Sequence, residues 1–427
     1  MKLRIEKAIY GGAGLARVQG KAVFVPFALP GETVEARIAE ESRGYATAEV
    51  ESVVEPSAAR VQPLCPYFGA CGGCHYQHAD YAAQVAMKIA ILRETLERAR
   101  IRVIPEIAAL SGEPWGYRNR IRLHVQRNPF SLCYKKRKSN VNLPVAACPI
   151  VAPALQRVIE ILHREGEAVG LADWVHELEL FTDPDESQLL MSLWTKRPSG
   201  DAQRMLTQTW PRLQDHLPGL MGAGVFSVER GRQPSQLLAN AGEVSASYRV
   251  AERAYRVSLG SFFQANRFLI DALVRLVTDG EAGEAAWDLY AGVGLFSLPL
   301  AAQFAEVTAV EAAASSVRDL RENLHGTKHR VVATETAGFL RRAVEQKTVA
   351  PDLVVVDPPR SGLGREVTAF LGKIRAPRIT YVSCDPATLS RDLAALLESG
   401  YRLRKMHLVD LFPQTFHLES VAQLALD

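Results

Sequence analysis

The feature that most restricts the fold is a regular alternation of apolar runs and amphipathic segments from about residue 283 onward. The apolar runs are short and rich in β-branched residues, and they read AAWDLY, VTAVE, RVVATE, DLVVVDPP and ITYVSC. Short apolar runs separated by helical patterns are typical of a doubly wound α/β domain with a mostly parallel sheet. The sequence therefore predicts a Rossmann-like α/β domain in this part of the chain.

The rest of the 427-residue chain predicts two further parts. Residues 1–56 read as short strands separated by glycine turns, a pattern that suits a small OB-type barrel. Such barrels often bind oligonucleotides, although they also serve other purposes. Residues 57–255 combine a helical stretch at 80–99 with a mixed α+β, strand-rich region. We expect the α/β domain to occupy residues 256–427.

Composition adds few restrictions. A net charge of +3, with 48% hydrophobic and 23% charged residues, is that of a soluble globular protein. This charge neither implies nor excludes a nucleic-acid partner, so any basic surface must be local. The first residues lack the apolar core of a signal peptide, so we expect a cytoplasmic protein with no membrane partner and no obligate protein partner. In that compartment cysteines are more often ligands or nucleophiles than disulfides.

A glycine-rich turn follows the first apolar run of the α/β domain. Gly292 and Gly294 lie in this turn, and Ser297 stands where the dinucleotide-binding fingerprint has its third glycine. No lysine follows, so the turn is not a phosphate-binding P-loop. Glu311 ends the next strand, where its carboxylate can accept hydrogen bonds from both ribose hydroxyls of an adenosine. The pattern favours S-adenosylmethionine over the alternative, a simple βα turn with a solvated glutamate.

Two other strand ends carry reactive side chains. Asp357 follows an apolar run and precedes two prolines, so it either contacts a ligand or simply ends a strand. Cys384, in RITYVSCDPATLSRD, lies where a strand gives way to a helix, with Asp385 as the N-cap and Pro386 as the first helical residue. The helix dipole favours the thiolate, whereas Asp385 opposes it. We expect a nucleophile here, the alternative being an inert, partly buried cysteine.

A thiolate beside a methyl donor suggests a particular reaction. Carbon 5 of a pyrimidine is a poor nucleophile until a thiolate adds to carbon 6. After methyl transfer, a base must remove the proton on carbon 5 so that the thiolate can leave. Glu419, on the predicted terminal strand HLESVAQLALD, is the candidate base, although a lone glutamate is usually a surface acid.

A cysteine cluster in CPYFGACGGCHYQH predicts a metal centre. Cys65, Cys71 and Cys74 lie within ten residues, and Cys148 or Cys133 is the candidate fourth ligand. This spacing is irregular for zinc, and an iron–sulfur cluster accepts looser spacing, so both metals remain open at this point.

Basic residues concentrate between the cysteine cluster and the α/β domain. Arg118, Arg120 and Arg122 alternate along a probable strand, so they share one face. Four consecutive basic residues follow at 135–138. The two groups suit contacts with RNA phosphates, and the alternative for 135–138 is a solvated loop.

Taken together, these motifs resemble the RNA uracil-C5 methyltransferase family, the TrmA/RumA group. The resemblance covers nearly the whole chain, in family order: CGGCHYQH, GYRNRIRLHV, SFFQANRFL, DLYAGVGLFSLPLA, DPPRSGLG, YVSCDPATLSRD and DLFPQTFHLESVAQL. It implies an N-terminal TRAM barrel, a class I methyltransferase domain, S-adenosylmethionine as cofactor and a [4Fe-4S] cluster. The implied residues are Cys65, Cys71, Cys74 and Cys148 for the cluster, Gln264, Tyr290, Glu311 and Asp357 for the cofactor, Cys384 as nucleophile and Glu419 as base.

The resemblance also suggests the substrate. Relatives with both the barrel and the cluster act mostly on ribosomal RNA, so we expect methylation of a uridine in 23S rRNA, with tRNA as the second choice. Two departures are notable: Asp385 replaces the commoner asparagine, and residues 334–339 lack an aspartate expected to bind adenine. The alternatives from other classes are a methyltransferase acting on another nucleophile and a non-catalytic RNA-binding metalloprotein.

Overall fold

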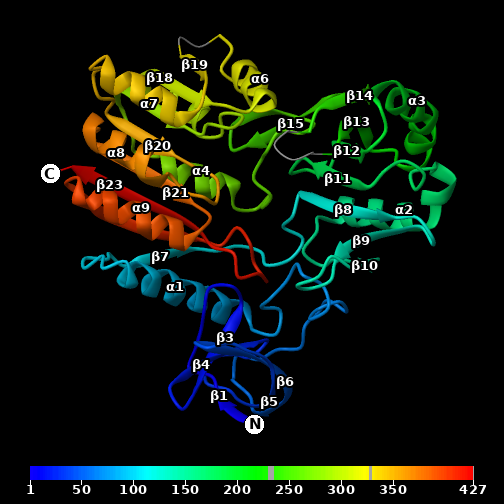
Figure 1. The fold of residues 1–427 in the computed structure, drawn as a ribbon. Helices are drawn as coiled ribbons and strands as arrows, with labels where there is room; N and C mark the ends of the chain where they lie inside the picture. The colour runs from blue at the N-terminus through cyan, green and yellow to red at the C-terminus, as the bar shows by residue number, and fades with distance from the viewer. Residues whose placement is uncertain (229–234, 327–328, 427) are drawn as a thin grey trace.

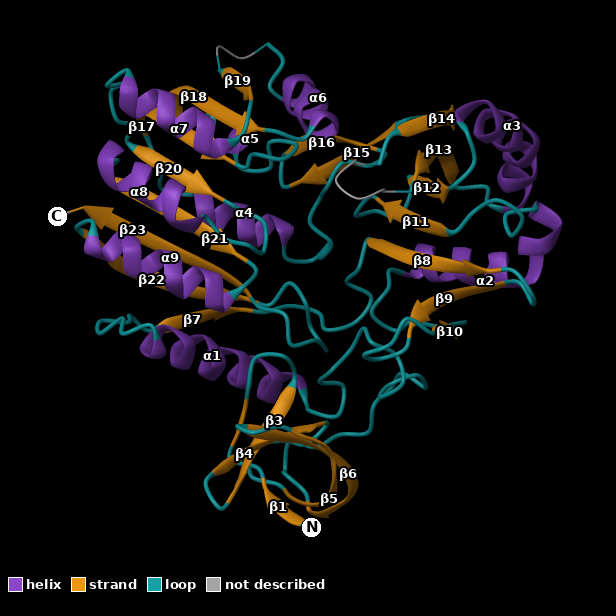
Figure 2. Ribbon diagram, in the orientation of Figure 1, coloured by secondary structure: helices purple, strands orange, loops and turns teal. Residues whose placement is uncertain are grey.

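A computed structural model describes residues 1–228, 235–326 and 329–426 of the chain (Figure 1). The N-terminal barrel lies below a long helix, the middle region lies to one side, and the α/β domain lies above (Figure 2). The candidate site depends mainly on how the strands of the α/β domain pair with one another.

The N-terminal part forms the predicted β-structure. Its six strands pair in the order β1-β5-β6-β4-β3-β2 and enclose a small core that includes Val25, Val34 and Ala36. The strands are β1 (Lys2–Arg4), β2 (Lys7–Ala8), β3 (Ala13–Val18), β4 (Lys21–Pro26), β5 (Thr33–Glu41) and β6 (Tyr45–Glu55).

The middle region is built on a seven-stranded sheet with the order β10-β9-β8-β11-β12-β13-β14. Helices α2 and α3 pack against the sheet, and the hairpin β15–β16 leads to the α/β domain. The elements are β8 (Arg120–Gln126), β9 (Ser131–Lys135), β10 (Asn142–Pro144), α2 (Pro153–Val169), β11 (Glu177–Thr182), β12 (Leu189–Thr195), α3 (Ser199–His216), β13 (Leu220–Ser227), β14 (Leu237–Gly242), β15 (Ser245–Val250) and β16 (Arg253–Ser258).

The α/β domain has an eight-stranded sheet with the order β19-β18-β17-β20-β21-β23-β22-β7, which confirms the predicted doubly wound class. The strands from β19 to β21 are parallel, and β23 is antiparallel to both of its neighbours. The elements are α4 (Ile270–Thr278), β17 (Gly283–Leu289), α5 (Ser297–Leu300), β18 (Phe304–Glu311), α6 (Ala314–Asn323), β19 (Arg330–Ala333), α7 (Thr336–Glu345), β20 (Leu353–Val356), α8 (Gly364–Ile374), β21 (Arg378–Ser383), α9 (Pro386–Glu398), β22 (Tyr401–Val409) and β23 (Glu419–Leu426).

One segment joins this sheet from earlier in the chain. Strand β7 (Ile107–Leu110) pairs in parallel with β22, and helix α1 (Tyr81–Arg98) packs against α9 and β7. The side chain of Asp80 caps α1 by accepting from the amide of Ala83 at 2.7 Å. The sequence assigns this segment to the middle region of the chain, whereas its pairing places it with the α/β sheet. The three-part division by residue number stays a prediction.

Helix α1 also carries a fully buried lysine. The ammonium of Lys88 lies 2.6 Å from Asp410 Oδ1, with both side chains 0% exposed, and it donates to the carbonyl of Phe412 at 2.9 Å. The loop between β22 and β23 therefore contains a buried carboxylate whose charge is balanced from α1.

None of the helices in the described part of the chain has the length and apolar character that crossing a membrane requires.

We expect Lys88→Met to lower the free energy of unfolding by about 3–5 kcal/mol, because it leaves the Asp410 carboxylate buried without its partner. The double variant Lys88→Met/Asp410→Leu should regain most of this loss. Urea denaturation followed by circular dichroism measures both. Arg127→Met is the matched control: its ion pair with Asp173 is exposed, so the loss should stay below about 1 kcal/mol. Equal losses for Lys88→Met and Arg127→Met would contradict the assigned role of the buried pair.

Candidate active site

The strand register brings five of the six predicted catalytic and cofactor residues to one edge of the sheet. Leu289 in β17 is paired with Val310 on one side and Val356 on the other, and Ser383 in β21 is paired with Ser420. Because β23 is antiparallel, it begins at the edge where the parallel strands end. The residues at or next to these pairs are Glu311, Tyr290, Asp357, Cys384 and Glu419.

Cys384 and Glu419 lie at the ends of two directly paired strands. Their neighbours Ser383 and Ser420 are register partners, and the Ser420 hydroxyl donates to the Ser383 carbonyl at 3.2 Å. Glu419 is buried at 3% exposure, and Cys384 is half-buried. The predicted nucleophile and the predicted base therefore face the same small region.

The Glu311 carboxylate is held by backbone amides. Its Oε2 accepts from Gly292 at 2.8 Å, and its Oε1 accepts from Ala312 and Ala313 at 2.8 and 2.7 Å. A carboxylate has about four acceptor positions and the amides occupy three, so about one remains for a hydroxyl group. Gly292 has a φ of 56°, in the left-handed region that suits glycine. The glycine is thus needed for the turn that orients Glu311.

The backbone of Tyr290 also has a left-handed conformation, with a φ of 63°. A residue with a β-carbon is strained in this conformation by about 1–3 kcal/mol, and such strain concentrates at functional sites. The pKa of its hydroxyl is raised because the side chain is buried. This strain is consistent with a backbone shaped for a ligand.

Sequence reasoning missed Asp288 as a site residue. Its side chain is 0% exposed in β17, where Oδ2 accepts from the hydroxyl of Ser297 and Oδ1 has no partner among the described residues. Burial, with the nearby Glu311 charge, raises the pKa of Asp288 to about 7. Ser297, standing where a third glycine would be, thus supports Asp288. An aspartate inside an apolar run was the signal that could have identified it.

Two further carboxyl groups, those of Asp357 and Glu419, lie along the same edge of the sheet as Asp288. Burial and the Asp288 charge raise the pKa of Asp357 to about 7. Burial and the Asp357 charge raise the pKa of Glu419 well above its ordinary value. This row of buried and partly buried acids is a region where a cation would be stabilised.

The Cys384 thiolate is disfavoured in the free protein. Asp385 caps α9 as predicted, accepting from Ala387 and Thr388 at 3.0 and 2.9 Å. However, burial and then the charges of Glu419 and Asp357 raise the pKa of the Cys384 thiol to about 12. The helix dipole is therefore outweighed, because desolvation and two nearby carboxylates both disfavour the thiolate.

Arg360 opposes these acids and was not singled out from the sequence. Its charge lowers the pKa of both Cys384 and Glu419, although other effects prevail at each. The side chain is exposed, and its guanidinium lies 3.4 Å from Nδ1 of His417. The arginine directly after Asp-Pro-Pro was the available signal.

The barrel reaches this edge through Tyr10. The Tyr10 hydroxyl donates to Asp385 Oδ2 at 3.2 Å, and its ring packs edge-on against Phe416 at 5.3 Å between centroids. Near it, a β-carbon at Gly12 would lie 2.9 Å from His75, so glycine permits this close approach. The N-terminal part therefore contacts the N-cap that follows Cys384.

Gln264, the sixth predicted residue, lies in the loop after β16. It is 6% exposed, and its carbonyl accepts from the Asn119 side chain at 3.2 Å. The hydroxyl of Tyr255, in β16, donates to the Leu295 carbonyl in the glycine turn at 3.0 Å. This contact holds the end of β16 beside the turn.

The predicted cluster cysteines lie at the junction of the barrel and the middle region. All are free thiols. The charge of Cys71 and the charge of Cys148 both raise the pKa of Cys74. The charge of Cys65 raises the pKa of Cys71 and the pKa of Cys148. Burial raises the pKa of Cys74 to about 12 and of Cys148 to about 11. Cys133 instead contacts Gln126 and the Ser131 carbonyl. Within the described ranges, no three potential ligands are already arranged as a metal site.

Arg120 and Arg122 of β8, which were predicted to contact RNA phosphates, instead lie beside glutamates of the protein. Arg120 lies 3.3 Å from Glu179 and stacks over Phe181, and Arg122 pairs with Glu177 at 2.6 Å. The sequence did not show that β11 would place two glutamates beside these arginines. Their charges are largely balanced within the protein and are less available to phosphates.

Comparison with known proteins agrees with the geometry. The family model described as tRNA (Uracil-5-)-methyltransferase matches residues 80–426, and the TRAM domain model matches residues 1–50. The chain belongs to this methyltransferase family. Membership makes it an S-adenosylmethionine-dependent RNA uracil-C5 methyltransferase, as the sequence predicts.

The relatives of this methyltransferase match it over almost the full length. An Aquifex aeolicus protein described as an uncharacterized RNA methyltransferase is 35% identical over 99% of this chain and 98% of its own. The 23S rRNA (uracil(1939)-C(5))-methyltransferase RlmD of Shewanella sp. MR-7 is 35% identical over 96% of this chain and 92% of its own. The Pyrococcus abyssi tRNA (uracil-54, C5)-methyltransferase, solved with S-adenosyl-L-homocysteine, shares the fold with a TM-score of 0.78 at 23% identity, covering 100% of both chains.

In the free methyltransferase, we expect alkylation of Cys384 by iodoacetamide to accelerate about tenfold per pH unit through the neutral and mildly alkaline range, because its pKa lies near 12. Glu419→Gln removes a carboxylate that raises this pKa, so the profile should move to lower pH. Peptide mass spectrometry separates Cys384 from the other cysteines. A rate that is already constant near neutral pH would contradict the raised pKa.

Proposed function

We propose that this methyltransferase methylates carbon 5 of a uridine in 23S rRNA, with Cys384 as the nucleophile and Glu419 as the base. The observation that carries the proposal is the pairing of Ser383 with Ser420, which sets the thiol and the carboxyl at adjacent strand ends. A carbon-6 addition mechanism needs both groups on one pyrimidine ring.

The steps follow from these residues. The Cys384 thiol loses its proton to solvent, the sulfur forms a bond to carbon 6, and the electron pair of the carbon 5–carbon 6 double bond moves to carbon 5, which becomes nucleophilic. S-adenosylmethionine supplies the methyl group to carbon 5 when it is bound. Glu419 then takes the proton from carbon 5, the double bond re-forms and the Cys384 thiolate leaves. Burial and the Asp357 charge raise the pKa of Glu419, which makes its carboxylate a stronger proton acceptor than an exposed glutamate.

The proposed cofactor residues are Gln264, Tyr290, Glu311 and Asp357. The methyl donor carries a sulfonium cation, and the buried acids Asp288 and Asp357 form an edge that favours a positive charge. Glu311, held by three amides, retains about one acceptor position for a ribose hydroxyl. Binding of the cation would also offset the carboxylates that suppress the Cys384 thiolate.

Ribosomal RNA is favoured by the relatives that match over the full length and are named for 23S rRNA. A tRNA uridine is the second candidate, supported by the family description and by the Pyrococcus abyssi structure. A substrate uridine in folded RNA must unstack from the neighbouring bases to enter the site, at a cost of about a few kcal/mol.

We also propose that Cys65, Cys71, Cys74 and Cys148 hold a [4Fe-4S] cluster. Four reduced thiols are the donor set that such a cluster takes. The Arg118 charge lowers the pKa of both Cys74 and Cys148, and its buried Nε has no hydrogen-bond partner among the described residues. A partly buried cation beside Cys74 and Cys148 fits an anionic cluster. Its role would be structural, because the carbon-6 mechanism transfers no electrons.

The uridine reaction is tested by covalent trapping. Transcripts of 23S rRNA or tRNA with 5-fluorouridine are mixed with the protein and S-adenosylmethionine, then separated on a denaturing gel. Fluorine cannot leave as a proton, so a covalent protein–RNA band should persist with 23S rRNA and map to Cys384. Cys384→Ala should give no band. A band with tRNA alone would favour the second substrate, and no band with either RNA would contradict the mechanism.

The cluster is tested by anaerobic metal analysis of purified protein. We expect about four iron atoms and four sulfides per chain and a visible absorption band near 400 nm. Cys148→Ala should lose most of the iron, whereas Cys133→Ala, the matched control, should retain it. Zinc in place of iron, or equal iron loss in both variants, would contradict the assignment.

A further inference from the structure

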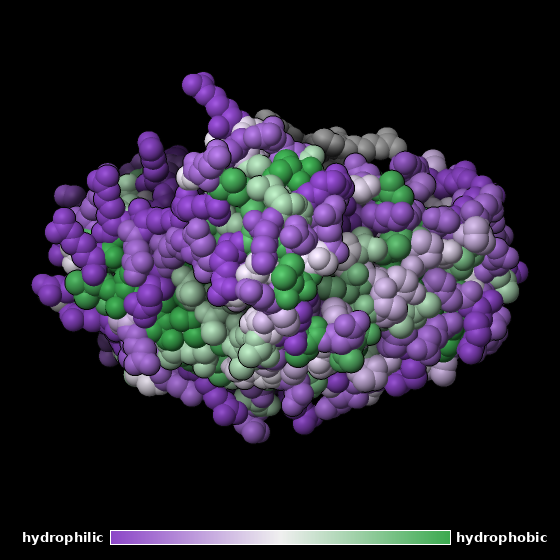
Figure 3. All heavy atoms as spheres, turned by 90° about the horizontal axis from the view of Figure 1, so that it is seen from below, coloured by the Kyte–Doolittle hydropathy of each residue, from purple (hydrophilic) through white to green (hydrophobic). Residues whose placement is uncertain are grey.

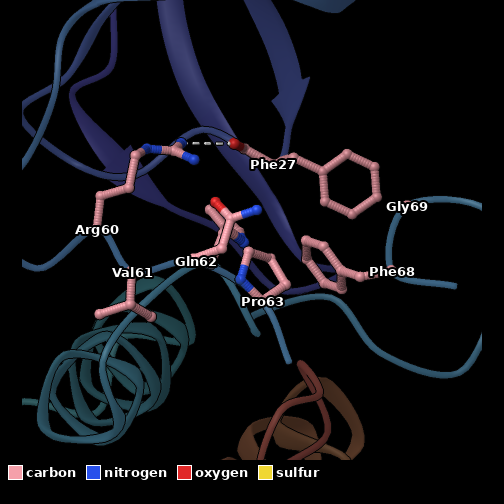
Figure 4. A pocket seen from close by; sticks show the side chains of 8 residues that line it. Phe27, Arg60, Val61, Gln62, Pro63, Phe68 and Gly69 are labelled. Carbon is pink, nitrogen blue, oxygen red and sulfur yellow. Dashed lines mark hydrogen bonds between the residues drawn. The ribbon is translucent and has the colours of Figure 1, made fainter. Parts of the chain in front are cut away.

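A cavity of about 490 Å³ lies between the barrel and the loop that carries Cys65, Cys71 and Cys74, here called the cysteine loop, outside the proposed active site (Figure 4). Its aromatic rings and Arg60 lie on opposite sides, and the molecule seen from below carries apolar patches between charged ones (Figure 3). The lining residues are Phe27, Arg60, Val61, Gln62, Pro63, Phe68, Gly69 and His78.

The aromatic wall is assembled from two segments of the chain. Phe27 follows β4 of the barrel, whereas Phe68 and His78 belong to the cysteine loop. The ring centroids of Phe27 and Phe68 are 5.1 Å apart, and those of Phe68 and His78 are 5.5 Å apart. Such rings offer flat apolar faces at a partly open surface.

A third segment adds positive charge. The guanidinium of Arg137 lies 4.7 Å from the centre of the Phe27 ring, and its amide donates to Ala70 of the cysteine loop at 2.9 Å. Lys136 and Lys138 beside it are exposed. Among the described residues, no carboxylate pairs with Arg137. The basic run at 135–138 is thus fixed against the rim of the cavity.

Two features point to a ligand. His78 is 2% exposed, yet neither ring nitrogen has a hydrogen-bond partner within the described part of the chain, and the ring lines the cavity. Phe27 has a left-handed φ of 62°, a strained conformation for a residue with a β-carbon. Arg60 holds it there by donating to its carbonyl at 2.8 Å while pairing with the buried Glu32. The structure therefore maintains an aromatic surface and unpaired nitrogens at one place.

We propose that this cavity binds one unpaired base of the substrate RNA, away from the uridine that is methylated. The base stacks on Phe68 with its edge toward His78, whose ring lines the cavity, and Arg137, which lies over the Phe27 ring, binds the adjoining phosphate. Single-stranded RNA is recognised in this way, by stacking on aromatic rings beside basic side chains. Arg137, which pairs with no carboxylate in the described part of the chain, favours a polyanion over an apolar segment of a protein. The inference rests on the proposed RNA substrate.

The test measures binding of a fluorescein-labelled 23S rRNA fragment by anisotropy, together with methylation kinetics. We expect Phe68→Leu to weaken binding about tenfold, because leucine fills the space but does not stack, and to raise KM with kcat unchanged. Phe68→Tyr, which retains the ring, should bind as the wild type does. Tyr45→Leu is the matched control, an aromatic residue of the barrel that is 46% exposed and packs on Phe24 outside the cavity.

Abasic substitutions at single positions of the fragment identify the bound base. At one position other than the target, the abasic RNA should bind wild type about tenfold more weakly and show no further loss with Phe68→Leu. If wild type binds the fragment but Phe68→Leu binds it equally well, or if Tyr45→Leu is equally weakened, the inference is overturned. If wild type does not bind the fragment at all, the proposed function itself fails.

Discussion

The buried ion pair between Lys88 and Asp410 is the constraint on which the arrangement of the active site depends. It fixes the start of the loop that leads into β23, and Glu419 is the first residue of that strand. The same loop is held by Gln84, which donates to and accepts from Gln414 at 3.0 and 2.9 Å. Helix α1 therefore determines where the proposed base lies, although it is more than 300 residues earlier in the chain.

Other parts of the molecule hold the same loop. The amides of His75 and Tyr76, directly after Cys74, donate to the Gln414 carbonyl at 2.8 and 3.0 Å. Tyr117, from the middle region, donates to the Pro413 carbonyl at 3.0 Å. The proposed cluster would thus brace the catalytic loop through two backbone hydrogen bonds. This gives a physical reason for a structural cluster in an enzyme whose proposed reaction transfers no electrons.

The electrostatics of the site suit a reaction that begins only when its substrates are bound. Buried acids suppress the Cys384 thiolate in the free protein, and they form the same edge that would stabilise a sulfonium cation. Such an arrangement would keep the proposed nucleophile protonated until a cation is present. The contact between Tyr10 and Asp385 further links the barrel to the helix that follows the proposed nucleophile.

The sequence by itself determined the features that depend on short-range order. The doubly wound domain, the glycine turn before Glu311, the Asp385 cap after Cys384 and the strand that carries Glu419 all follow from local pattern and turn chemistry. Only the tertiary structure decided which strands would be neighbours. Insertion of β23 beside β21 brings Glu419 to Cys384, β11 balances the charges of Arg120 and Arg122, and desolvation raises the thiol pKa. These outcomes depend on contacts between residues far apart in the chain, and local propensity carries no information about them.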